Sequence, residues 1–102
     1  MLALRPNCEA CDRDLPPAAT DAMICSYECT FCRECVETRL ANVCPNCGGG
    51  FVPRPIPPAR SWRPTTGLDR HPPSDQRVHM KHRSEDLKDF IQEIKGISPE
   101  AR

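Results

Sequence analysis

Eight cysteines carry the clearest chemical signal in this sequence. They are all in the first half of the chain, at Cys8, Cys11, Cys25, Cys29, Cys32, Cys35, Cys44 and Cys47. They form four close pairs, and two thiolates at such a spacing can both reach one ion about 2.3 Å away. Eight thiols in four pairs therefore predict two tetrahedral four-cysteine sites, each holding one zinc ion. Because neither site keeps an open position, we expect a structural role for both ions.

The spacing alone leaves two ways to share the pairs between the ions. In a sequential arrangement, the first two pairs bind one ion and the last two bind the other. In an interleaved arrangement, one ion takes Cys8, Cys11, Cys32 and Cys35, and the other takes Cys25, Cys29, Cys44 and Cys47. We favour interleaving, because it frees residues 34–43 for a short helix with Val36, Leu40 and Val43 on its inner face. Cys32 and Cys35 then lie at the helix start, where the helix dipole favours thiolates.

Composition and the N-terminal sequence favour metal over disulfides. The chain has 102 residues, of which 38% are hydrophobic and 12 are prolines, so a conventional core is not expected and a covalent or metal staple is needed. The first residues have no basic segment followed by a signal-peptide apolar run. No stretch approaches the ~20 apolar residues of a membrane span. We therefore expect a cytoplasmic protein without membrane association, in which thiols stay reduced.

The elements that must position the cysteines divide the chain into three parts. Residues 1–51 form the zinc domain, in which Met23, Ile24, Tyr27 and Phe31 are expected to build a small hairpin before the helix. Residues 52–83 are rich in proline and arginine and are expected to be an extended or disordered linker. Trp62 in this linker is either solvated or a contact to the head or to a partner.

Residues 84–96 form the third part, which is predicted to be an amphipathic helix. Ser84 is the expected N-cap, Glu85 and Asp86 follow where the dipole favours acids, and Gly96 ends the helix. One apolar stripe contains Leu87, Phe90, Ile91 and Ile94. A helix this short is marginal alone in water, so the stripe must cover its own head, a partner protein or a second copy of the chain.

The order and spacing of the cysteines resemble a RING finger, a cross-brace zinc module. The stretch "CTFCREC" at 29–35 is similar to the region around the fourth to sixth RING ligands, and "CPNC" at 44–47 is similar to the closing knuckle. Cys29 stands where most RING fingers have histidine, which makes this an all-cysteine variant. The resemblance implies a small zinc-stabilised α+β head of treble-clef type. The N-terminal half also resembles a family of short bacterial cysteine-rich proteins of unknown function.

A RING resemblance raises the hypothesis of a ubiquitin-ligase-like scaffold, and three departures argue against it. Ligase-type RINGs carry a bulky aliphatic residue where this chain has Ala10 and a basic residue where it has Gly48, and "RLANV" at the helix end lacks an aromatic residue. We therefore expect no catalytic activity. The chain is predicted to be a zinc-built interaction module for a protein whose identity the sequence does not give.

Two further function classes are less favoured. Residues 1–50 carry four Lys/Arg against seven Asp/Glu, so nucleic-acid binding is not expected. The basic residues of the tail are interpreted as a solvated scatter: Arg54, Arg60, Arg63, Arg70, Arg77, Lys81 and Arg83. A redox- or zinc-responsive switch is open to any four-cysteine site. The histidines His71, His79 and His82 are expected to be solvated, because eight thiols already complete two sites.

Overall fold

A short antiparallel hairpin supplies the first two strands of the head. The computed structural model describes all 102 residues, and in it β1 (Ala22–Ile24) pairs with β2 (Thr30–Cys32). All six strand residues are buried, which confirms the predicted hairpin. We had expected Tyr27 to pack in the hairpin, but it does not. It lies in the turn between the strands, where its side chain is 72% exposed.

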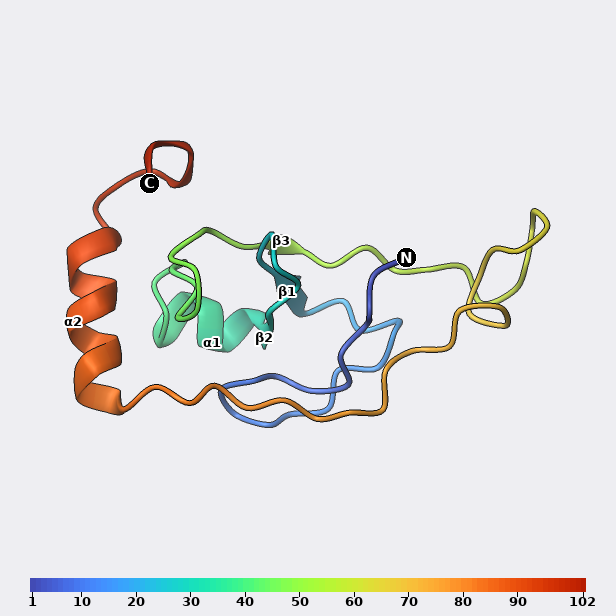
Figure 1. Cartoon of the computed structure of the whole chain (residues 1–102), viewed down its shortest axis with the longest axis horizontal. Helices are drawn as coiled ribbons and strands as arrows, with labels where there is room; N and C mark the ends of the chain where they lie inside the picture. Colours follow the sequence, from blue (N-terminus) through green and yellow to red (C-terminus); the bar gives the residue numbers. More distant parts are fainter.

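The proline-rich segment after the head contributes a third strand. β3 (Val52–Pro53) pairs antiparallel with β1, so the sheet order is β2-β1-β3. The Arg54 amide then donates to the Ala22 carbonyl at 2.8 Å. Proline tolerates this position because an edge strand needs no donor on its outer side. The head is thus a small α+β unit built on a three-stranded antiparallel sheet (Figure 1).

The helix that follows β2 is shorter than the sequence predicted. α1 spans Arg33–Thr38 rather than residues 34–43. Ala41 and Asn42 have φ values of 49° and 60°, and two consecutive left-handed residues cannot continue an α-helix. Leu40 and Val43 are nevertheless fully buried, because the turn directs them into the same core that the helix was expected to reach.

The core is small, and cysteines are interspersed among its apolar side chains. Phe31 and Phe51 meet edge to face with ring centroids 5.3 Å apart. Leu15, Leu40 and other buried apolar residues pack in the same cluster as six of the cysteines. The site and the core are therefore one structure, and disruption of either disturbs the other.

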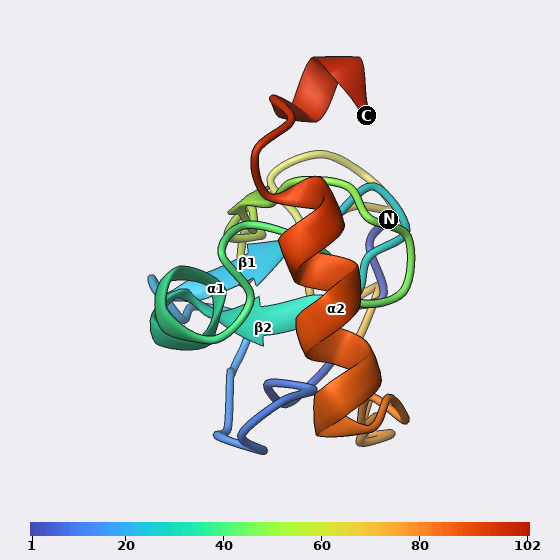
Figure 2. The same cartoon turned by 90° about the vertical axis from the view of Figure 1, so that its left-hand side faces the viewer.

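The C-terminal helix lies across one end of the head. α2 spans Ser84–Ile94, and η1 (Pro99–Ala101) is a single 3₁₀ turn beyond it. Figure 2 shows α2 in front of one end of β1 and β2, with α1 to its side. Ser84 is the first helical residue, not the N-cap. Arg83 occupies the cap position and its side chain makes no capping bond, so the expected Ser84 cap was wrong.

The apolar stripe of α2 faces the chain's own head. Leu87 and Ile91 are buried in the core cluster, and Phe90 and Ile94 pack partly buried against it. The head of the same chain therefore covers the apolar stripe of α2. Self-association through these residues stays a prediction. Neither α1 nor α2 has the length and the apolar character that a membrane-spanning helix requires.

Candidate metal centre

Four thiols from two distant segments converge at one end of β2. Cys8 and Cys11 come from a turn before the sheet, Cys32 ends β2, and Cys35 lies in the first turn of α1. Their sulfurs all lie within 4.8 Å of one another, and the Cys11 and Cys32 sulfurs are 3.8 Å apart. Two sulfurs bound to one tetrahedral zinc ion are separated by about 3.8 Å. This donor set therefore fits a closed four-thiolate site.

A second group of thiols gathers where the hairpin turn meets the closing knuckle. The sulfurs of Cys25, Cys44 and Cys47 lie within 4.8 Å of one another. Cys29, which we predicted as the fourth ligand, lies next to Cys25 but outside this tight group. Its sulfur accepts a hydrogen bond from Asn46 Nδ2 at 3.3 Å. The second group thus has three converging thiols with a fourth beside them.

The groups follow the interleaved arrangement. The first joins residues 8–11 to residues 32–35, and the second joins residue 25 to residues 44–47. A sequential arrangement would place Cys11 with Cys25, and the sulfurs do not gather in that way. Because each group links segments that are far apart in sequence, the two groups together brace the hairpin and α1 from both sides.

Backbone amides point at three of the sulfurs. The amide of Cys11 donates to Cys8 Sγ at 3.5 Å, that of Tyr27 to Cys25 Sγ at 3.3 Å, and that of Gly49 to Cys47 Sγ at 3.4 Å. Hydrogen bonds to the charged form of a group favour that form. The turns around the cysteines are therefore already shaped to accept thiolates.

Burial opposes the ionisation of three of the thiols. It raises the pKa of Cys35 and of Cys44 far above the ordinary value, and neighbouring thiols raise both further. Burial also raises the pKa of Cys29. A buried thiolate needs a compensating positive charge, which a bound cation would supply. A metal ion held by these thiols would therefore displace their protons.

Two buried charged residues, which the sequence pattern did not single out, hold the first knuckle in place. Glu9 lies inside the knuckle, where its carboxylate accepts from the Thr30 amide at 2.6 Å and from Arg5 Nη1 at 2.8 Å. Its position between Cys8 and Cys11 was the available clue. Arg54, interpreted as solvated, is only 4% exposed.

Arg54 is buried because its guanidinium replaces water with carbonyl groups. It donates to the carbonyl oxygens of Arg5 at 2.9 Å, Leu15 at 3.1 Å and Pro16 at 2.9 Å. Burial lowers the pKa of this arginine, but the three acceptors offset much of the lost hydration. Arg54 thereby ties β3 to the N-terminal segment that carries the first knuckle.

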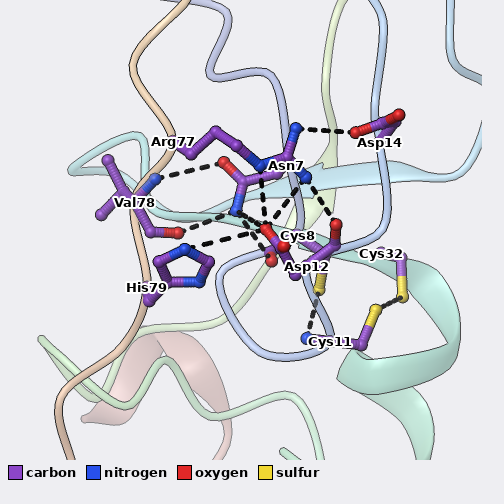
Figure 3. Close-up of polar contacts among 9 residues, drawn as sticks. All are labelled: Asn7, Cys8, Cys11, Asp12, Asp14, Cys32, Arg77, Val78 and His79. Atoms are coloured by element: carbon purple, nitrogen blue, oxygen red, sulfur yellow. Dashed lines mark hydrogen bonds and ion pairs between the residues drawn. The ribbon is translucent and has the colours of Figure 1, made fainter.

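A strap from the tail, residues 77–82, runs over the first knuckle (Figure 3). Asn7 Nδ2 donates to the Val78 carbonyl at 2.9 Å, and the Val78 amide donates to Asn7 Oδ1 at 3.2 Å. Arg77 forms ion pairs with Asp12 at 2.9 Å and Asp14 at 2.7 Å. Arg77 is therefore engaged, contrary to its interpretation as a solvated charge.

The strap continues to the second knuckle. The Met80 amide donates to the Glu9 carbonyl at 2.9 Å, and His82 Nε2 lies 2.9 Å from Asn46 Oδ1. This contact orients the Asn46 amide so that its nitrogen faces Cys29. None of the three histidines joins a cysteine group. His82 instead reaches the second group indirectly, through Asn46.

Comparisons with known proteins place the chain in a family. Residues 1–57 match the family described as "Protein of unknown function (DUF1272)". An uncharacterized protein of Rhizobium meliloti is 58% identical over 78 residues, which cover 76% of this chain and 86% of the relative. No solved structure matches. The match to residues 1–57 covers the sheet and both cysteine groups, and the chain belongs to the DUF1272 family.

Proposed function

We propose that the chain is a non-catalytic, RING-like zinc module that binds another protein. The observation that supports it most is the convergence of four sulfurs from Cys8, Cys11, Cys32 and Cys35. Two segments more than twenty residues apart meet there, with three of the four thiols buried. Four thiolates fill every position of a tetrahedral zinc ion, so such a site supports structure and leaves no place for a substrate.

The second ion belongs to Cys25, Cys44 and Cys47, with Cys29 as the fourth ligand. When bound, each ion supplies a cross-link that the small core does not provide. The residues around the ligands supply hydrogen bonds to the sulfurs and exclude water from the buried ones. A cytoplasmic location, in which the thiols stay reduced, is part of the same proposal.

The surroundings of Gly48 argue against a ligase-like scaffold. Gly48 has a φ of 78°, and a Cβ built on it would lie 3.3 Å from Ile94 and 3.6 Å from Phe90. The position where ligase-type RINGs carry a basic side chain is therefore covered by α2. Ala10 is packed partly buried against the core and offers no bulky aliphatic contact. Both features support an interaction role without ubiquitin transfer.

Elemental analysis of protein purified without chelator tests the zinc assignment. We expect about two zinc ions per chain, and a value near one or an iron–sulfur absorbance band would contradict it. A discharge assay with ubiquitin-charged conjugating enzymes tests the absence of ligase activity. Discharge that requires the cysteine groups would overturn the non-catalytic proposal.

A further inference from the structure

The far end of the molecule carries a closed loop that packs on no core. This arginine–tryptophan loop, residues 58–71, projects away from the head at the end opposite α2 (Figure 1). The Leu68 amide donates to the Pro58 carbonyl at 3.0 Å and closes the base of the loop. Ser61 is bound to Asp69 twice, from its amide at 3.2 Å and from its hydroxyl at 2.6 Å. These bonds link the two arms of the loop.

Further contacts fix the return arm of the loop. The amides of Arg70 and His71 donate to the Gly67 carbonyl at 3.1 and 2.9 Å, and His71 Nε2 lies 2.9 Å from the Thr65 carbonyl. Gly67 has a φ of 86°, and a Cβ there would lie 2.5 Å from the Arg60 carbonyl oxygen. Only glycine fits this close approach. The loop is thus held in one shape by its own hydrogen bonds.

Trp62 is displayed by this loop and has no apolar cover. Its side chain is 73% exposed, more than any other large hydrophobic residue of the chain. The Arg60 guanidinium lies 5.0 Å from the ring centroid, a cation–π distance that restrains both side chains. A compact surface loop that is held by its own hydrogen bonds and carries an exposed indole ring is typical of a binding element.

The loop also concentrates positive charge. It carries Arg60, Arg63 and Arg70, all exposed, against the single acid Asp69. The Ser61 hydrogen bonds lower the pKa of Asp69 and occupy both of its oxygens. Of the other four arginines in residues 52–102, Arg54 and Arg77 are engaged within the chain as shown above, Arg102 donates to the carbonyls of Asn42 and Gly48, and Arg83 lies 4.0 Å from Glu85. Three of the four exposed arginines of the tail outside the ion pairs of Arg77 therefore lie in the loop that carries the one tryptophan, and only Arg83 lies elsewhere.

We propose that the arginine–tryptophan loop binds an acidic segment of a partner protein. An apolar side chain of that segment covers Trp62, and its carboxylates pair with Arg60 and Arg63. This inference rests on the proposed protein-interaction function and adds the surface and the chemistry of the partner. Tryptophan and arginine are the residues that most often dominate the binding energy of protein interfaces.

A protein segment fits this loop better than a polyanion or a lipid surface. Three arginines give few phosphate contacts, and phosphate affinity grows with the number of contacts. A long polyanion would also meet a head with four basic and seven acidic residues in its first fifty. Trp62 is the only aromatic residue of the loop, so the apolar area available for a membrane is small.

The experiment uses the zinc-loaded full chain as bait for random linear peptides displayed on phage, and the enriched peptides are then titrated against the wild-type chain and against Trp62→Ala. We expect enriched peptides in which Asp or Glu flank an apolar residue. Because Trp62 is the only tryptophan, its emission should shift to shorter wavelength as the peptide binds. Binding should weaken at least about 30-fold in Trp62→Ala, the loss expected of a hot-spot residue.

Two further variants test the charges. Arg63→Glu should also weaken peptide binding, and Lys88→Ala on the exposed face of α2 is the matched control that should not. All three variants should keep two zinc ions and the wild-type circular dichroism. Peptides that bind Trp62→Ala as well as wild type, or no enrichment at all, would overturn the assignment.

Other ligands are tested by the same fluorescence signal. Quenching of Trp62 by a single-stranded oligonucleotide, or a blue shift on phosphatidylglycerol vesicles, without a response to the acidic peptides would also overturn it. If the peptides bind elsewhere while two zinc ions remain, the loop assignment fails and the proposed module function stands. A zinc content near zero would instead contradict the proposed function itself.

Discussion

Residues 1–51 and residues 52–102 of this chain are held in shape by different interactions. The first half contains all eight cysteines and every buried apolar residue except Leu87 and Ile91. The second half holds its position through the guanidinium of Arg54, the strap at residues 77–82 and the stripe of α2. The comparison indicates that the head can define its own fold once its thiols are braced, whereas the tail takes its shape largely from the head.

The largest expected effect comes from breaking the brace. Cys32→Ala removes a ligand from the group that joins residues 8–11 to α1. Because structural zinc contributes roughly 10–16 kcal/mol in small zinc domains, we expect loss of the head fold and, with it, release of the tail. NMR dispersion, circular dichroism and zinc content measure this. The exposed Gln92→Ala serves as control, and a Cys32→Ala head that stays folded would show that the core is sufficient alone.

Acidification should release metal from the head by proton competition. Burial raises the pKa of Cys35 and Cys44, so the metal-free thiols are protonated at neutral pH and below. The metal-bound state holds fewer protons, and lowering the pH therefore favours release. The logarithm of zinc affinity should fall by up to about four per pH unit and site. A chromogenic chelator measures this slope, and a slope near zero below pH 8 would contradict it.

Arg54 tests the junction between the two halves. Arg54→Ala leaves three carbonyl oxygens without their donor, one of them buried and two partly buried. Hydrogen bonds to charged groups contribute about 1.5–3 kcal/mol each. Because the variant no longer bears the cost of desolvating the guanidinium, the loss is smaller than the sum of the three bonds, and we expect the free energy of unfolding to fall by about 3 kcal/mol. Urea unfolding of zinc-saturated protein measures it. Lys88→Ala should change little, and an equal effect of both variants would show that Arg54 acts only through charge.

Leu87→Ala tests the docking of the tail alone. Leu87 is 9% exposed against the head, and truncation of a buried leucine costs about 2–5 kcal/mol, with the lower end expected at a surface-docked helix. We expect faster amide exchange and proteolysis in α2, with two zinc ions retained. Gln92→Ala is again the control. Loss of zinc in Leu87→Ala would mean that the head depends on the tail, which reverses the comparison.

Sequence patterns predicted the features that depend on spacing. The cysteine pairs, the hairpin between them and the stripe of α2 follow from short-range periodicity, and the structure has all three. The end of α1 at Thr38 was missed, because two left-handed residues stop it and neither Ala41 nor Asn42 is a glycine that would have signalled the turn. Cys29 lies beside its group with its sulfur hydrogen-bonded to Asn46, and the spacing of the cysteines does not indicate this contact.

Tertiary contacts account for the burial of Arg54. Arg54 was interpreted as solvated because charges in a proline-rich linker usually face solvent. The carbonyl groups that bury it come from residues about forty positions earlier. Nothing local marks such a partner. The Ser84 cap was wrong by one residue: Arg83, with extended backbone angles, is the N-cap and Ser84 is the first helical residue.

The bonds between Asn7 and Val78 have a consequence for folding order. They join residues 71 positions apart. If this loop closed before the head had formed, the chain would lose the full entropy of loop closure and gain only two hydrogen bonds in return. The head should therefore assemble first and the strap close last. In reverse, the strap can open while the sheet persists, so the Met80 amide should exchange with solvent through a smaller opening than the amide of Phe31. The first knuckle is then uncovered in a molecule that is otherwise native.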